Sequence, residues 1–159
     1  MEESIGKYLI QDLITCNLEA KSEEDVFKKA YQMLYEKQYV KPSFLNGLIE
    51  REKVFPTGIK LEDYGVAIPH TDAVHVLKPA IALIKLNQPV RFQCMDGNGH
   101  VDVKLAFVMA LKEPHSQILM LQQLMKLIQN KELIEKIFKK DTPESIYNVI
   151  LESISIKNN

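Results

Sequence analysis

The stretch Val103–Leu111 constrains the fold of this chain more than any other. All of its nine residues except Lys104 are apolar. A run that is apolar at consecutive positions is typical of a central strand covered on both faces of a sheet, although periodicity alone does not distinguish it from a buried helix. We therefore expect a central sheet with helices packed on it.

Three shorter runs in the middle of the chain are also typical of strands, because they are rich in Val, Ile, Leu and Phe. They are residues 66–68, 80–86 and 90–94. The sequence Asp96-Gly97-Asn98-Gly99 lies between the last of these runs and the one at 103–111, and it is a strong turn signal. We expect the chain to reverse direction there.

Helical patterns flank these strands in the sequence. Ser22, followed by Glu23-Glu24-Asp25, is typical of a helix N-terminus, and this helix should run to about residue 38. Further helices are expected after Pro42, after Pro114, over Lys131–Phe138 and from Thr142 to about Ser153. The chain of 159 residues thus predicts a single layered α/β domain over residues 1–159.

Composition narrows the class of partner. Twenty Lys and Arg residues stand against 21 Asp and Glu, so no strong basic field attracts nucleic acid. Cys16 and Cys94 form no CxxC pair, and neither a disulfide framework nor a structural zinc site is predicted. No run reaches the roughly 18 apolar residues that a membrane span needs, and the first residues are acidic. We expect a soluble, cytoplasmic protein that binds proteins or small molecules.

His70 is the first candidate for chemistry. It ends the stretch Gly65-Val66-Ala67-Ile68-Pro69-His70, in which the proline should stop the strand and the next side chain can point into a cleft. A neutral imidazole, with its ordinary pKa of about 6.5, offers a nucleophilic nitrogen near neutral pH. A functional histidine and one that merely forms a hydrogen bond in a turn are about equally supported by this position.

Two other side chains suit the binding of an anion. Arg51 lies in the helix expected after Pro42, and a guanidinium can hold a phosphate or carboxylate through a planar two-pronged contact. A helical ion pair or a solvated charge is the commoner role of such an arginine. His115 lies where a helix begins and backbone N–H groups favour an anion, and its alternative is a polar residue in a surface loop.

Other kinds of site have weaker support. His70, Asp72 and His75 could bind a metal, but the two histidines are five residues apart, whereas paired zinc histidines on a helix are usually four apart. The chain has no GxSxG elbow and no glycine-rich phosphate loop, and Cys94 lies in an apolar run. We interpret His75 and His100 as surface histidines near turns. Neither a metal nor a cofactor is expected.

The motifs, taken in order, resemble those of a known family. Arg51-Glu52, Phe55-Pro56-Thr57-Gly58 and the stretch that ends in His70-Thr71 are followed about 45 residues later by His115 at the start of an apolar helix. This set resembles the IIA component of the bacterial sugar phosphotransferase system, in the fructose/mannitol superfamily and most closely its galactitol-type branch. The resemblance covers nearly the whole chain and implies a mixed β-sheet flanked by α-helices on both sides.

The resemblance implies a phosphocarrier. In the family, the histidine of the IPH motif accepts a phosphoryl group from the carrier protein HPr and passes it to a cysteine of the IIB component. IIB then phosphorylates the sugar as the membrane component IIC transports it. By position, His70 would be the phosphoacceptor, modified on its tele nitrogen, with Arg51 and His115 beside the phosphoryl group. The alternative is a regulatory protein of the same ancestry, in which phosphorylation of His70 controls binding to a partner outside transport.

Overall fold

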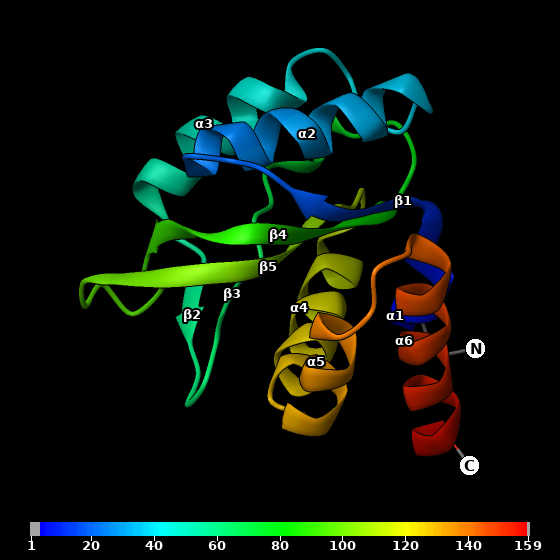
Figure 1. The fold of residues 1–159 in the computed structure, drawn as a ribbon. Coiled ribbons are helices and arrows are strands. Elements are labelled where there is room, and N and C mark those ends of the chain that lie inside the picture. Colours follow the sequence, from blue (N-terminus) through cyan, green and yellow to red (C-terminus); the bar gives the residue numbers. More distant parts are fainter. Residues whose placement is uncertain (1–3, 159) are drawn as a thin grey trace.

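The computed structural model describes residues 4–158 and has the layered α/β architecture that the sequence predicts (Figure 1). The strands of this part of the chain form one mixed sheet in the order β1-β4-β5-β3-β2. β4 runs antiparallel to β5 and β2 antiparallel to β3, whereas the pairs β1–β4 and β3–β5 are parallel. The strands are β1 (Leu9–Leu18), β2 (Gly58–Lys60), β3 (Gly65–Ala67), β4 (Ala80–Gln93) and β5 (His100–Ala110).

Helices cover both faces of the sheet, as Figure 1 shows. One face carries α2 (Glu23–Glu36) and α3 (Phe44–Val54). The other carries α1 (Ile5–Tyr8), α4 (Pro114–Ile128), α5 (Lys131–Phe138) and α6 (Pro143–Asn158). Each face has its own buried core, because alternate side chains of a strand point to opposite sides of a sheet. No helix within residues 4–158 is long and apolar enough to cross a membrane.

β5 is the central strand that the apolar run predicts. It lies between β4 and β3, and every side chain from Leu105 to Ala110 is fully buried. Burying one large apolar side chain contributes about 1.5–3 kcal/mol to folding, so Leu105, Phe107 and Met109 stabilise the centre of the sheet. β3, which leads to His70, is paired with this strand.

The two runs at 80–86 and 90–94, expected as separate strands, belong mainly to one strand. β4 pairs with β5 as far as Lys85 and again from Val90, and the register shifts between these two points. Leu86 is still buried, but Asn87, Gln88 and Pro89 are exposed, and Pro89 has no N–H to donate to the ladder. A bulge therefore interrupts β4 without ending it.

The turn predicted at residues 96–99 connects β4 to β5. Gly97 and Gly99 have φ angles of +80° and +77°, which glycine adopts without the steric penalty of a side chain. The Cys94 N–H donates to the Gly99 carbonyl oxygen across the turn at 2.9 Å. The hairpin thus forms where the sequence predicts it.

The sequence did not reveal the two edge strands. Exposed Gln11 and Asp12 interrupt the burial pattern of β1, and its pairing with β4 is irregular, so the strand lacks a clean alternation of apolar and polar residues. β2 has only three residues and begins at Gly58, directly after Pro56 and Thr57, where proline and glycine are typical of a break in regular structure. Short or irregular edge strands carry little periodic signal.

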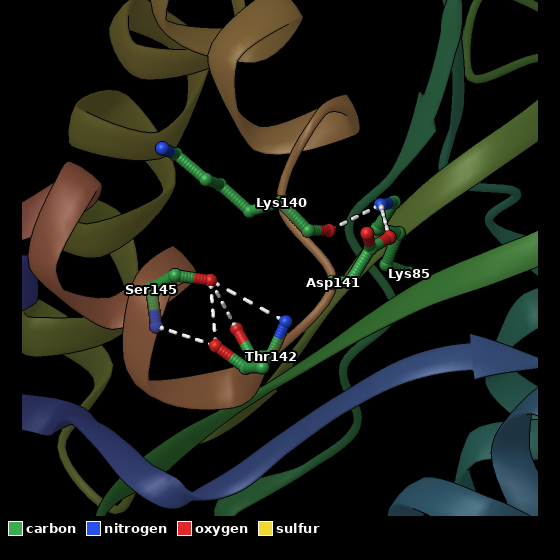
Figure 2. Close-up of polar contacts among 5 residues, drawn as sticks. All are labelled: Lys85, Lys140, Asp141, Thr142 and Ser145. Atoms are coloured by element: carbon green, nitrogen blue, oxygen red, sulfur yellow. Dashed lines mark hydrogen bonds and ion pairs between the residues drawn. The ribbon is translucent and has the colours of Figure 1, made fainter.

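The helix N-termini agree with the expected caps. The Ser22 hydroxyl accepts a hydrogen bond from the Asp25 N–H, and the Thr142 hydroxyl accepts one from the Ser145 N–H at 3.1 Å (Figure 2). These contacts satisfy N–H groups that have no partner within the helix. α2 ends slightly earlier than expected, and α6 continues beyond Ser153.

A buried lysine ties the sheet to the turn between α5 and α6 (Figure 2). Lys85 lies in β4, and its Nζ donates to the carbonyl oxygen of Lys140 at 2.5 Å. The carboxylate of Asp141 lies 4.0 Å from the same nitrogen. The apolar stem of Lys85 is covered while its ammonium group meets an oxygen, so the side chain joins β4 to the segment that begins α6.

The substitution Lys85→Met tests this link. Methionine keeps an apolar stem of similar length but removes the charged donor to the Lys140 carbonyl. We expect the free energy of unfolding, measured in urea, to fall by about 1.5–3 kcal/mol, the usual worth of a hydrogen bond to a charged group. Lys139→Met, at an exposed lysine of the same turn, should change it by less than about 0.5 kcal/mol. Equal stability of the two variants would contradict the link.

Candidate active site at the end of β3

The backbone on both sides of His70 fixes its position. The parallel pairing of β3 with β5 is interrupted after Ala67 and resumes at His70, which forms an isolated bridge with Met109. The Pro69 carbonyl oxygen accepts from the Met109 N–H at 2.9 Å. The expectation that Pro69 stops the ladder is therefore only partly right. Proline removes one donor, but its carbonyl still pairs with the central strand.

One hydrogen bond orients the imidazole of His70. Its Nδ1 lies 3.0 Å from the carbonyl oxygen of Ile68. A carbonyl oxygen only accepts hydrogen bonds, so Nδ1 carries the proton of the neutral ring. The lone pair of that ring is then on Nε2. The structure thus favours the tautomer in which Nε2 is the unprotonated nitrogen of neutral His70.

The surroundings of His70 favour the neutral ring. Burial lowers the pKa of His70 below its ordinary value of 6.5, and the positive charge of Arg51 lowers it further. The hydrogen bond to the Ile68 carbonyl and the negative charge of Asp72 act in the opposite direction. The net effect is a lowered pKa, which keeps Nε2 unprotonated over more of the pH range.

Arg51 lies in the last turn of α3 with its charge directed to the site. Its Nη1 is 3.5 Å from Oδ1 of Asp72, and its guanidinium lies over the Phe55 ring, 4.5 Å from the ring centroid. Its Nε is buried and has no hydrogen-bond partner among residues 4–158. Buried donors are normally paired, so this nitrogen is available to an anion that enters the site.

One stripe of α3 holds the segment that follows His70. Ser43, Gly47 and Arg51 are four residues apart and so lie on one side of the helix. The Ser43 hydroxyl is 2.7 Å from Nδ1 of His75. A Cβ added to Gly47 would lie 2.9 Å from both the His75 ring and the Thr71 hydroxyl. Glycine therefore permits the close approach of α3 to residues 71–75.

His75 differs from its expected role as a surface histidine. It ends the short 3₁₀ helix η1 (Ala73–His75), is half-buried, and its ring is bound to Ser43. His100 is exposed at the start of β5, as expected. Within residues 4–158, no group of three or more His, Cys, Asp or Glu side chains is placed to hold a metal ion.

The first turn of α4 lies against the residue that follows His70. Nε2 of Gln117 donates to the carbonyl oxygen of Thr71 at 3.2 Å. His115 is in the same turn and is exposed. The N-terminus of α4, with its free N–H groups, is thus brought to the site. A contact of the His115 ring with a bound phosphoryl group stays a prediction.

Sequence reasoning gave no role to Glu52, which is a buried acid beside the site. Its side chain continues the buried stripe of α3 that contains Phe44 and Leu48, at a spacing of four residues. This four-residue spacing is the sequence pattern that could have identified Glu52 as a buried residue. Its Oε2 accepts from the Thr57 N–H at 2.7 Å, and its Oε1 accepts from the Thr57 hydroxyl at 2.9 Å. Burial raises the pKa of Glu52 to about 7, although both hydrogen bonds act to lower it.

Glu52→Gln tests the cost of burying this acid. The pKa of Glu52 in the folded chain, about 7, is above its ordinary value of 4.5. The favourable contribution of Glu52 to the free energy of unfolding is therefore complete below pH 4.5 and is lost as the pH rises through 7. Glutamine keeps the shape and cannot ionise. The free energy of unfolding of Glu52→Gln, measured with a denaturant and taken relative to that of the wild type, should rise by an amount on the order of 2 kcal/mol between pH 5 and pH 8. A difference that does not change with pH would contradict the raised pKa.

Comparison with known proteins identifies the family. The model described as "Phosphoenolpyruvate-dependent sugar phosphotransferase system, EIIA 2" matches residues 7–153. The galactitol-specific EIIA component of Escherichia coli (strain K12) is 35% identical over 99 residues, which are 62% of this chain and 66% of that protein. The nitrogen regulatory protein of Pseudomonas aeruginosa is 26% identical over 112 residues, which are 69% of each protein.

A solved structure shares the fold. It is the Escherichia coli complex of enzyme IIAMTL with phosphorylated enzyme IIBMTL, to which the chain is similar with a TM-score of 0.70. The identity is 19%, and the match covers 89% of this chain and 95% of that chain. The family match extends over nearly all of the sheet and its helices, including the strand end that carries His70. The chain therefore belongs to the EIIA type 2 family of the phosphoenolpyruvate-dependent sugar phosphotransferase system.

Proposed function

We propose that this chain carries a phosphoryl group on Nε2 of His70, accepts it from phosphorylated HPr, and passes it to a cysteine of a IIB component during sugar uptake. The orientation of the His70 ring is the observation that carries this proposal. Its Nδ1 is bound to the Ile68 carbonyl, which leaves Nε2 as the nucleophile. The similarity to a galactitol-specific component favours galactitol or a related sugar over a fructose/mannitol-type substrate.

The proposed transfer is an in-line displacement. The lone pair of His70 Nε2 forms the new N–P bond as the P–N bond of the donor phosphohistidine breaks, and the electron pair of that bond returns to the donor imidazole. In the second step, a IIB cysteine thiolate attacks phosphorus and the electron pair returns to His70. Such transfers need positioning and charge stabilisation at the phosphoryl oxygens more than covalent help. The donor is already an activated phosphoramidate, so the step draws on no nucleotide or metal.

Donors for the phosphoryl oxygens come from two elements. The unpaired Nε of Arg51 is one, at the end of α3. The N-terminus of α4 offers backbone N–H groups, and His115 in its first turn can add a side-chain donor. A planar guanidinium can follow the oxygens as phosphorus changes geometry during transfer.

Exposed apolar side chains belong to the same segments and support a relay between proteins. Val54 and Phe55 follow Arg51, Val74 lies in η1 after His70, and Ile118 is in the first turns of α4. Large apolar side chains in contact with water around a site favour docking of a protein partner. A carrier must release each partner after transfer, so we expect interfaces at the small end of the usual range.

A regulatory role is the second candidate, and the similarity to a nitrogen regulatory protein favours it. In that case, phosphorylation of His70 would control binding to a partner outside transport. A panel of IIB components separates the two roles. Transfer to at least one IIB supports the carrier, whereas failure with all of them, together with phosphorylation-dependent binding of another protein, supports the regulator.

Labelling tests the phosphoacceptor directly. Incubation with enzyme I, HPr and labelled phosphoenolpyruvate should place one acid-labile phosphate on each chain, since phosphohistidine is hydrolysed in acid. His70→Ala should abolish the label because the nucleophile is gone. His100→Ala, at an exposed histidine of β5, is the matched control and should label normally. A stoichiometric acid-labile phosphate on the His70→Ala variant would contradict the proposal.

The rate of phosphorylation in the same assay distinguishes the roles of Arg51 and His115. Arg51→Gln should slow phosphorylation at least about a hundredfold, as the loss of a donor to developing charge does in other enzymes. Arg51→Lys should recover only part of the rate, because an ammonium group cannot make the two-pronged contact. His115→Ala should lower the rate of phosphorylation by less than Arg51→Gln does, because the backbone N–H groups at the N-terminus of α4 remain. An unchanged rate in Arg51→Gln would exclude a direct role for this arginine.

A further inference from the structure

We propose that Glu52 is a positioning residue, which fixes the tautomer and orientation of His70 through Thr57 and Ile68. Its effect on transfer rate rests on the proposed function, whereas its effect on the His70 ring does not. Glu52 touches neither the reacting nitrogen nor any of the groups that face the phosphoryl oxygens. It acts through a continuous path of hydrogen bonds that ends on the imidazole.

The path has three links. The Glu52 carboxylate accepts from the Thr57 N–H at 2.7 Å and from the Thr57 hydroxyl at 2.9 Å. The Thr57 carbonyl oxygen accepts from the Ile68 N–H at 3.3 Å. The Ile68 carbonyl oxygen accepts from Nδ1 of His70 at 3.0 Å. Successive hydrogen bonds share a residue, first Thr57 and then Ile68.

Ile68 depends on this path because its N–H is bound to Thr57 and not to the central strand. β3 ends at Ala67, and pairing with β5 resumes only at His70, so Ile68 lies in the gap of the ladder. Its N–H is bound by Thr57 instead. Ile68, whose carbonyl orients His70, is therefore held through its N–H by the loop before β2, whereas the next carbonyl, that of Pro69, is held by the central strand.

The loop before β2 depends in turn on Glu52. Thr57 follows Pro56, which has no N–H to donate, and precedes the three-residue strand β2. Both donors of Thr57, its N–H and its hydroxyl, are directed to the Glu52 carboxylate. Without that carboxylate, two donors of a residue that is only 2% exposed would have no partner, and the loop would have to move to satisfy them.

Glu52 is itself well anchored. It is 4% exposed, and its neighbours on the buried stripe of α3, Phe44 and Leu48, are core residues. Arg51 precedes it in the same helical turn and is directed to the other side, where the anion would bind. The last turn of α3 therefore sets the positions of both the imidazole and the guanidinium of the site.

Glu52 acts on His70 through the geometry of these hydrogen bonds and not through its charge. The groups that shift the pKa of His70 are its burial, the Ile68 carbonyl, Arg51 and Asp72, and Glu52 is not among them. A protonated carboxyl can still accept from the Thr57 N–H and donate to the Thr57 hydroxyl. A glutamine can do the same, whereas an aspartate is one methylene too short to reach both donors from a fixed helix.

Nitrogen NMR of the unphosphorylated chain provides the first test. The chemical shifts of Nδ1 and Nε2 report which nitrogen of neutral His70 carries the proton. We expect the Nδ1–H tautomer in the wild type and in Glu52→Gln, and a mixture of the two tautomers in Glu52→Asp. Glu50→Gln, at an exposed acid of the same helix, is the matched control and should resemble the wild type.

Phosphorylation kinetics provide the second test. Glu52→Asp should lower the maximal rate of phosphorylation by phospho-HPr about tenfold or more, because a displaced nucleophile loses the near-attack geometry. The half-saturating HPr concentration should stay within about twofold, since the exposed apolar residues that would dock HPr are unaltered. Glu52→Gln should retain the wild-type rate within about twofold.

Several results would overturn the proposal. A pure Nδ1–H tautomer in Glu52→Asp is one, and a Glu52→Gln variant as impaired as Glu52→Asp is another, since charge would then be the cause. If Glu52→Asp does not fold, Thr57→Val keeps the proposal testable. Thr57→Val removes one of the two donors to Glu52, and it should shift the tautomer population of His70 in the same direction as Glu52→Asp but by less. A His70 tautomer identical to that of the wild type in Thr57→Val would overturn the proposal. If the wild type takes no phosphate, the proposed function fails while the tautomer result still decides the role of Glu52.

Discussion

The hydrogen bond from Nδ1 of His70 to the carbonyl oxygen of Ile68 is the interaction on which the site depends. It determines which nitrogen carries the proton, and so which nitrogen would attack phosphorus in the proposed transfer. Burial and the charge of Arg51 lower the pKa of the ring, which keeps the second nitrogen free. A single acceptor, two residues before the histidine, thus leaves Nε2 as the nitrogen that would act as nucleophile in the proposed transfer.

The rest of the fold supports this contact from two directions. β5, buried on both faces, fixes β3 and receives the chain again at His70 through Met109. α3 approaches from the other side and carries Arg51, which would bind the proposed phosphoryl group, and Glu52, whose carboxylate binds the loop that holds Ile68. A buried central strand and a helix therefore meet where β3 leaves its regular pairing with β5. That arrangement suits a reaction that depends on position more than on bond polarisation.

The sequence was most informative where a single local pattern decides the structure. The apolar run at Val103–Leu111 predicted the central strand, the glycines at 97 and 99 predicted the hairpin, and Ser22 and Thr142 predicted helix starts. His70 and Arg51 could be selected from residue type and position. The irregular edge strand β1 and the bulge that joins 80–86 to 90–94 could not, because they depend on pairing with distant residues. The tautomer of His70 and the burial of Glu52 depend likewise on contacts made only in the folded chain.

The proposed reaction of His70 through Nε2 depends on the binding of Nδ1 to the backbone. The most direct measurement is NMR of the chain labelled with ¹⁵N at histidine and phosphorylated by enzyme I, HPr and phosphoenolpyruvate, in which one-bond coupling to ³¹P identifies the modified nitrogen. We expect coupling to Nε2 of His70, with the proton retained on Nδ1. Coupling to Nδ1 of His70, or to a nitrogen of any other histidine, would contradict it.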